Sequence, residues 1–175
     1  MRVIAGEFRS RKLKTSEGLE TRPTPDRLRE SLFSILQSEI EGVTFLDAYA
    51  GSGAVGIEAL SRGASRAIFV ERSRSAAEVL KENISTLRLE SRSEIFTGKV
   101  LQILKKKSAD IIFLDPPYEL ESEYSSALEL LGENPPQLVI VQHSKRFDPG
   151  DEHGKLIRDR VVRQGENALS FYRLP

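Results

Sequence analysis

The residues with the clearest chemical potential stand together in Asp115-Pro116-Pro117-Tyr118, directly after the apolar run Ile111–Leu114. The run predicts a buried strand, and the two prolines stiffen the path by which the chain leaves it, because each restricts φ and lacks an N–H. An amino group on a planar base needs two hydrogen-bond acceptors and a face for stacking. A carboxylate, a proline carbonyl and a ring supply these, so the four residues are the predicted catalytic group. The alternative is a strand that ends in a Pro-rich turn with an exposed tyrosine.

A second candidate site is the first predicted strand-to-helix turn, where Gly51, Gly53 and Gly56 match the pattern G-x-G-x-x-G. Glycines at such a turn allow a ligand to approach the backbone closely at a helix N-terminus. Glu71 follows about twenty residues later, at the end of the second predicted strand, where it can accept hydrogen bonds from ribose hydroxyls. The spacing predicts a cofactor that contains adenosine, bound by Gly51, Ser52, Gly53 and Glu71.

Asp47, at the end of the first predicted strand, bears on which cofactor this is. A carboxylate at this position would repel the pyrophosphate of a dinucleotide, and it would attract the ammonium and sulfonium groups of S-adenosylmethionine. We therefore expect S-adenosylmethionine rather than NAD, and Asp47 as one of its binding residues. A structural or helix-capping Asp47 is the alternative.

The composition predicts a soluble, single-domain protein of the cytoplasm. The 175 residues are 39% hydrophobic and 30% charged, with no net charge and no cysteine. The absence of cysteine suits a reducing compartment, and neither a signal peptide nor a membrane-spanning apolar run is predicted. The chain has two histidines, His143 and His153, which we expect on the surface, and two histidines do not form a metal site.

Basic residues are concentrated at the N-terminus, where one acid, Glu7, stands among Arg2, Arg9, Arg11, Lys12 and Lys14. Two short strands over residues 2–5 and 9–14, around a turn at Gly6-Glu7, would form a basic β-hairpin, followed by a polar linker over residues 15–22. Such a hairpin contacts nucleic acid in one interpretation and is a charged, solvated sheet edge in the other.

The remaining chain alternates between strand and helix patterns. Thr24-Pro25-Asp26 predicts a helix start, with Thr24 as N-cap and Pro25 at the first helical position, and the helical pattern continues to Ile40. Strands are predicted at 43–48, 67–70, 94–96, 111–114 and 138–141, with helices at 53–61, 75–87, near 100–104 and at 121–131. Alternation of this kind predicts an α/β fold with a parallel sheet, and the closing pair of strands, 156–162 and 168–173, must form an antiparallel hairpin.

The combined motifs resemble those of class I S-adenosylmethionine-dependent methyltransferases, in the branch whose D/N-P-P-Y/F motif serves amino groups. The N-terminal blocks resemble more specifically the RsmD type of bacterial 16S rRNA guanine-N2 methyltransferase. The similar segments are residues 2–13, 22–33, 46–53, 58–64 and 167–172.

The resemblance implies a Rossmann-like fold with a seven-stranded, mostly parallel sheet whose last strand is antiparallel. It also implies methyl transfer to guanine N2 in 16S rRNA or the assembling small subunit, by a monomer. The basic extension, residues 1–22, would engage RNA and residues 23–175 would form the methyltransferase domain. The expected nucleic-acid contacts are Arg2, Arg9, Arg11, Lys12, Arg22 and Arg27.

The chain departs from the family pattern at two points. After the third strand the family has an acid that contacts the adenine amino group, whereas this chain has Lys99, which cannot accept a hydrogen bond. The backbone of Val100 remains the expected contact with the adenine ring. The polar segment 143–154 is also short, so we expect no helix before the sixth strand.

The motifs leave other functions open. The Asp115 carboxylate and the Pro116 carbonyl could orient any exocyclic amine, including adenine N6 in DNA or another RNA. A carboxyl group with a pKa of ~4 is a weak base, so we expect Asp115 to orient the amine rather than remove its proton early. Lys99 keeps a non-catalytic RNA-binding protein on the same fold as an alternative. The glycine pattern alone is also found in NAD oxidoreductases, which Asp47 disfavours.

Overall fold

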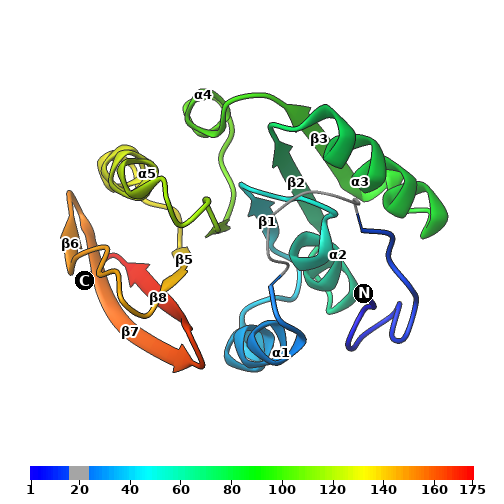
Figure 1. Cartoon of the computed structure of the whole chain (residues 1–175), viewed down its shortest axis with the longest axis horizontal. Coiled ribbons are helices and arrows are strands. Elements are labelled where there is room, and N and C mark those ends of the chain that lie inside the picture. The colour runs from blue at the N-terminus through cyan, green and yellow to red at the C-terminus, as the bar shows by residue number, and fades with distance from the viewer. Residues whose placement is uncertain (16–23) are drawn as a thin grey trace.

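The computed structural model describes residues 1–15 and 24–175 and is built on one mixed sheet (Figure 1). The strands are β1 (Thr44–Asp47), β2 (Arg66–Glu71), β3 (Ser93–Thr97), β4 (Ile111–Leu114), β5 (Leu138–Ser144), β6 (Glu152–His153), β7 (Leu156–Gln164) and β8 (Asn167–Arg173). The helices are α1 (Asp26–Ile35), α2 (Ala54–Ser61), α3 (Arg74–Thr86), α4 (Val100–Leu104) and α5 (Glu121–Glu133), with short 3-10 turns at Leu36–Ser38 and Glu90–Arg92.

The strand order is β3-β2-β1-β4-β5-β8-β7-β6. The first five strands pair in parallel, whereas β8 is antiparallel to β5 and β7 is antiparallel to β8. The predicted Rossmann-like α/β fold is confirmed. The sheet has eight strands instead of the expected seven, because a two-residue strand, β6, pairs with β7. It lies in the polar segment 143–154, for which no helix was predicted.

Helices cover both faces of the sheet, which explains why β4 is apolar at every position. Ile111 and Phe113 pack toward α1 and α2, and Ile112 and Leu114 pack toward α4 and α5. A central parallel strand is buried on both faces, so it shows a continuous apolar run rather than alternation. On the same face as α2, Val3 and Leu13 of the N-terminal segment share a core cluster with α3.

The N-terminal segment does not form the predicted β-hairpin. Arg2 and Lys12 form one isolated antiparallel bridge, and no longer strand is present over residues 1–15. The amide N–H groups of Ile4 and Ala5 donate instead to the buried carboxylate of Glu58 on α2, at 2.8 and 3.0 Å. The two arms do meet, since the Val3 N–H donates to the Arg11 carbonyl at 3.0 Å and the Leu13 N–H to the Met1 carbonyl at 2.9 Å. They do not extend into the two predicted strands, because a helix side chain takes backbone N–H groups that a longer ladder would use.

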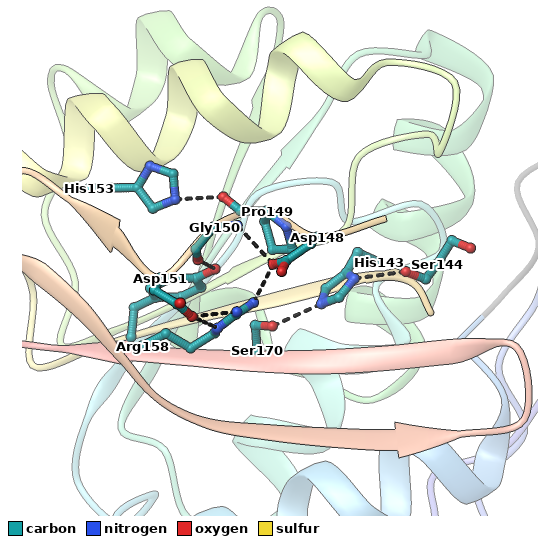
Figure 2. Close-up of polar contacts among 10 residues, drawn as sticks. His143, Ser144, Asp148, Pro149, Gly150, Asp151, His153, Arg158 and Ser170 are labelled. Carbon is teal, nitrogen blue, oxygen red and sulfur yellow. Dashed lines mark hydrogen bonds and ion pairs between the residues drawn. The ribbon is translucent and has the colours of Figure 1, made fainter. Parts of the chain in front are cut away.

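Two local predictions also need correction. Helix α1 begins at Asp26 with Pro25 at the N-cap, and the hydroxyl of Thr24 donates to Gln142 at 3.1 Å instead of capping the helix. His143 is buried rather than on the surface, with its ring nitrogens 2.8 Å from the Ser144 carbonyl and the Ser170 hydroxyl (Figure 2).

We expect Gly6→Ala to undock the N-terminal segment from α2. Gly6 has a φ of +83°, and an added Cβ would lie 1.9 Å from the carbonyl oxygen of Ser61. Gly165→Ala is the matched control, because φ is +59° there and the Cβ would meet open space. The control should lose about 1 kcal/mol of unfolding free energy from backbone strain alone. Gly6→Ala should lose at least twice that, with faster hydrogen exchange at Ile4, Ala5 and Phe8. Equal losses with protected amides would contradict the docking.

Candidate active site at the carboxyl edge of the sheet

Three carboxylates gather where neighbouring parallel strands end. Asp47 is the last residue of β1, Glu71 is the last residue of β2, and Asp115 directly follows β4. Because β1 pairs with both β2 and β4 in parallel, all three lie at one edge of the sheet. In open α/β sheets this carboxyl edge is where ligands bind.

Glu71 shapes the glycine loop through backbone hydrogen bonds. One carboxylate oxygen accepts from the Gly51 N–H and the other from the Ser73 N–H, each at 2.7 Å. A carboxylate has about four acceptor sites, so both oxygens can still receive ribose hydroxyls. Gly51 has a φ of +54°, and a Cβ there would meet open space, so the loop leaves room for a ligand on this side. Gly53 is also required for packing, since an added Cβ there would lie 2.3 Å from Leu80.

Asp47 has both a structural contact and an unused acceptor. It is buried, and one carboxylate oxygen accepts from the Gly56 N–H at 3.0 Å. Its other oxygen, Oδ1, has no hydrogen-bond partner among the residues that the structure describes. Burial raises the pKa of Asp47 to about 7, the Gly56 hydrogen bond opposes this, and the charge of Glu71 adds to it. A buried orphan acceptor fits a cationic ligand, which would relieve its desolvation.

Asp115 is coupled electrostatically to Asp47. Burial raises the pKa of Asp115 to about 8, and the negative charge of Asp47 contributes to the same rise. The nearby Thr24 side chain opposes this rise. The predicted catalytic carboxylate and the predicted cofactor-binding carboxylate therefore belong to one site.

The rest of the Asp-Pro-Pro-Tyr stretch is held by its neighbours. The carbonyl of Pro116 accepts from the Tyr124 hydroxyl at 3.2 Å, which leaves it a second lone pair. Pro117 is exposed, and its carbonyl accepts from the Leu120 N–H at 2.9 Å. Tyr118 is half-buried, and its hydroxyl donates to Asn167 at 2.6 Å. The ring of Tyr118 is thus oriented by the first residue of β8.

Sequence analysis missed several residues that support this site: Thr24, Gln142, Tyr124 and Asn167. Gln142 is a buried polar residue that continues an apolar strand, and this pattern break was the available signal. Nothing in the sequence indicated that Thr24 would contact Gln142, which is 118 positions away.

At the predicted adenine side, α4 begins at Val100. The Val100 side chain is buried in the core, so its backbone is the part that a ligand could reach. Lys99 precedes it and is exposed. The structure therefore places a cation, and no carboxylate, at the position where the family pattern has an acid.

Five of the six predicted nucleic-acid contacts are exposed. Arg2, Arg9, Arg11, Lys12 and Arg27 are exposed, and none is in a side-chain ion pair within residues 1–15 and 24–175. Arg22 and most of the predicted linker lie outside the described residues. Asn83 joins this segment to the glycine loop, because its side-chain amide donates to the carbonyls of Lys14 at 3.0 Å and Ser52 at 2.9 Å.

Within the described part of the chain, no group of three or more metal-ligating side chains is present. No described helix is long and apolar enough to cross a membrane.

The sheet order, the glycine loop and the carboxylates at the carboxyl edge define a Rossmann-like domain of the methyltransferase class. YlbH of Bacillus subtilis, named as a candidate rRNA methyltransferase, is 34% identical over 99% of this chain and 98% of its own length. The Haemophilus influenzae protein named ribosomal RNA small subunit methyltransferase D is 40% identical over 83% of this chain and 79% of its own. The solved structure of yhhF from Escherichia coli, described as a candidate methyltransferase, superposes with a TM-score of 0.85 at 32% identity, over 99% of this chain and 97% of that one.

The family profile described as Conserved hypothetical protein 95 matches residues 1–173. The chain belongs to this family, as the resemblance to the RsmD type predicted. The protein is an enzyme of the methyltransferase class.

We expect Asp47 to release a proton when S-adenosylmethionine binds near neutral pH. With a pKa of about 7, Asp47 is mostly protonated at pH 6.5, and a cationic ligand favours its ionised form. Calorimetry in buffers of different ionisation enthalpy measures the number of protons released. Asp47→Asn should release fewer protons than the wild type, by about half a proton or more, and should bind more weakly. Equal proton release by both proteins would refute the assignment.

Proposed function

We propose that the protein transfers a methyl group from S-adenosylmethionine to the exocyclic N2 of a guanine in small-subunit rRNA. The observation that carries this proposal is the position of Asp47 and Asp115 at the ends of two adjacent strands, which would join a site for a cation to a site for an amine. The names of the relatives, including ribosomal RNA small subunit methyltransferase D, support the rRNA target.

The cofactor would be held by the glycine loop and the two acids beside it. Gly51, Ser52 and Gly53 would approach it with backbone, Glu71 would accept from the ribose, and Val100 would contact the adenine. Asp47 would face the positively charged end. The cofactor supplies an electrophilic methyl group on a sulfonium, and no metal is needed for the displacement.

The target amine would be oriented by the Asp-Pro-Pro-Tyr stretch. The Asp115 carboxylate and the free lone pair of the Pro116 carbonyl would accept its two N–H bonds, which localises the nitrogen lone pair and aims it at the methyl carbon. The Tyr118 ring would stack on the base after it leaves the RNA helix. The positive sulfonium of the bound cofactor would favour the ionised form of Asp115, whose pKa is about 8 without it. The nitrogen becomes cationic as the new N–C bond forms, and burial makes the ionised Asp115 a better proton acceptor than an ordinary carboxylate. Asp115 therefore orients the amine first and takes its proton afterwards.

The first experiment is transfer of labelled methyl from S-adenosylmethionine to unmodified small ribosomal subunits, naked 16S rRNA and DNA. We expect label on rRNA, recovered as N2-methylguanosine when the nucleosides are identified by mass. Label on adenine or DNA would refute the target. No label on any substrate would favour a non-catalytic RNA-binding protein.

We expect Asp115→Asn to reduce methyl transfer by at least about 100-fold, because the substituted residue accepts one hydrogen bond without the charge. Affinity for S-adenosylmethionine, measured by calorimetry, should stay within a few-fold of wild type. Asp159→Asn is the control, since Asp159 is exposed on β7 in an ion pair with Arg173. Near-normal turnover by Asp115→Asn would show that Asp115 does not orient the amine.

We expect the triple substitution of Arg9, Arg11 and Lys12 by glutamine to weaken RNA binding and flatten its dependence on salt. Three lost phosphate contacts should reduce the slope of log affinity against log salt by about 2. The control triple changes Lys155, Arg160 and Arg163 to glutamine. All three are exposed and lie on β7 or directly before it, and Figure 1 shows β7 on the opposite side of the molecule from the N-terminus. An unchanged slope for the N-terminal triple would mean that this surface is only a solvated face.

A further inference from the structure

A cavity of about 290 Å³ lies beside the Asp-Pro-Pro-Tyr stretch. It is lined by Tyr118, Glu119, Glu121, Ser144, Arg146 and Phe147. Two of these residues come from the loop that leads into α5 and Glu121 is the first residue of α5, whereas three come from the end of β5 and the loop after it. The volume is near the lower limit for small-ligand sites, roughly 300 Å³.

This cavity is adjacent to the proposed reaction centre but distinct from it. Asp115 and Pro116, which would hold the target amine, do not line it. Tyr118 lines it and also belongs to the catalytic stretch. A ligand in the cavity would therefore be a neighbour of the target base and not the target base itself.

The wall formed by Phe147 is packed firmly. Its ring lies 4.9 Å from the ring of Tyr124 and 6.2 Å from that of His143, measured between centroids. Figure 2 shows His143 held between the Ser144 carbonyl and the Ser170 hydroxyl. The wall is therefore fixed to β5 and β8.

The loop that continues from Phe147 is fixed as well. Arg158 on β7 donates to Asp148 at 2.7 Å and also binds Asp151, as Figure 2 shows. These bonds hold the pKa of Asp148 below its usual value, so this carboxylate stays ionised. An aromatic wall fixed in this way loses little conformational entropy when a base stacks on it.

The polar groups of the cavity match a nucleotide whose base carries an amino group. The Arg146 side chain is 83% exposed and lies 3.8 Å from the carboxylate of Glu166, which also binds Lys145 at 2.6 Å. The guanidinium has further N–H donors, and these can meet a phosphate. Glu119 and Glu121 are exposed, and neither is in an ion pair in the described ranges, 1–15 and 24–175. Two carboxylates repel a phosphate but accept hydrogen bonds from an exocyclic amine, as in the contact of Glu with cytosine N4.

We propose that this cavity binds the nucleotide next to the target in the RNA, with its base stacked on Phe147, its amino group on Glu119 and Glu121 and its phosphate on Arg146. The proposal rests on the proposed function and adds a sequence preference to it. A cytosine fits the site, whereas a uracil would present a carbonyl oxygen to the carboxylates.

The test measures kcat/KM for methyl transfer to 16S rRNA that carries cytosine or uracil at each of the two neighbours of the methylated nucleotide. Wild-type enzyme should prefer cytosine at one neighbour by at least about fivefold. The double variant E119Q/E121Q should lose this preference, because a glutamine amide can donate to the uracil carbonyl. The matched control is E129Q/E133Q, which removes two exposed charges from the same helix, and it should keep the preference.

Equal rates with cytosine and uracil at both neighbours would overturn the proposal, as would a preference for uracil. A preference for cytosine that persists in E119Q/E121Q would also overturn it. Phe147→Leu should raise KM for the RNA at least severalfold and leave the affinity for S-adenosylmethionine unchanged, and an unchanged KM would refute the stacking. Failure of the proposed function itself is distinguishable, because wild-type enzyme would then methylate none of these RNAs.

Discussion

The parallel pairing of β1 with β4 is the constraint on which the rest of the site depends. It places Asp47 and Asp115 at the ends of adjacent strands, close enough for the charge of Asp47 to raise the pKa of Asp115. Both carboxyl groups are desolvated, so bringing them together costs free energy that the apolar strands behind them must offset. Ile111–Leu114 supply that burial on both faces of the sheet. A ligand with positive charge on one side and amine donors on the other would relieve this cost.

The N-terminal segment is tied to this arrangement through α2. The buried carboxylate of Glu58 accepts from two backbone N–H groups of the segment and from Arg62 at 2.8 Å. A buried carboxylate is tolerable when its lone pairs are filled by donors in this way. Asn83 then connects the far end of the segment to the glycine loop. The basic side chains are thus carried on a backbone whose position is fixed by α2 and by the glycine loop of the proposed cofactor site.

The proposed site for a second nucleotide depends on residues of β8. Asn167 at the start of β8 holds Tyr118, and Ser170 on the same strand holds His143. His143 in turn contacts Phe147, so the antiparallel end of the sheet positions both aromatic residues that line the cavity, Tyr118 and Phe147. Because β8 lies between β5 and β7, residues of both β8 and β7 can hold the segment around the end of β5. Ser170 on β8 binds His143, and Arg158 on β7 binds Asp148.

Local patterns predicted most of the elements correctly. The strand at Ile111–Leu114 was predicted with the bounds that it has, and the strand and helix around the glycine loop differ from their predicted ends by one residue. The absence of a helix between β5 and β7 was predicted from the short polar segment. Hydrophobic patterns over a few residues predict a strand or helix reliably where that element packs its apolar side chains against the core.

The failures share one cause. The hairpin over residues 1–15, the capping role of Thr24 and the exposed His143 were all predictions that assumed local partners. In the structure their polar groups bind Glu58, Gln142 and Ser170, each from a distant part of the chain. By itself the sequence determined the fold class, the glycine loop and the carboxylates at the strand ends, because these depend on spacing and residue type. Only the tertiary structure decided which distant side chains satisfy each buried donor and acceptor, since hydrogen-bond partners are chosen by proximity in space and not in sequence.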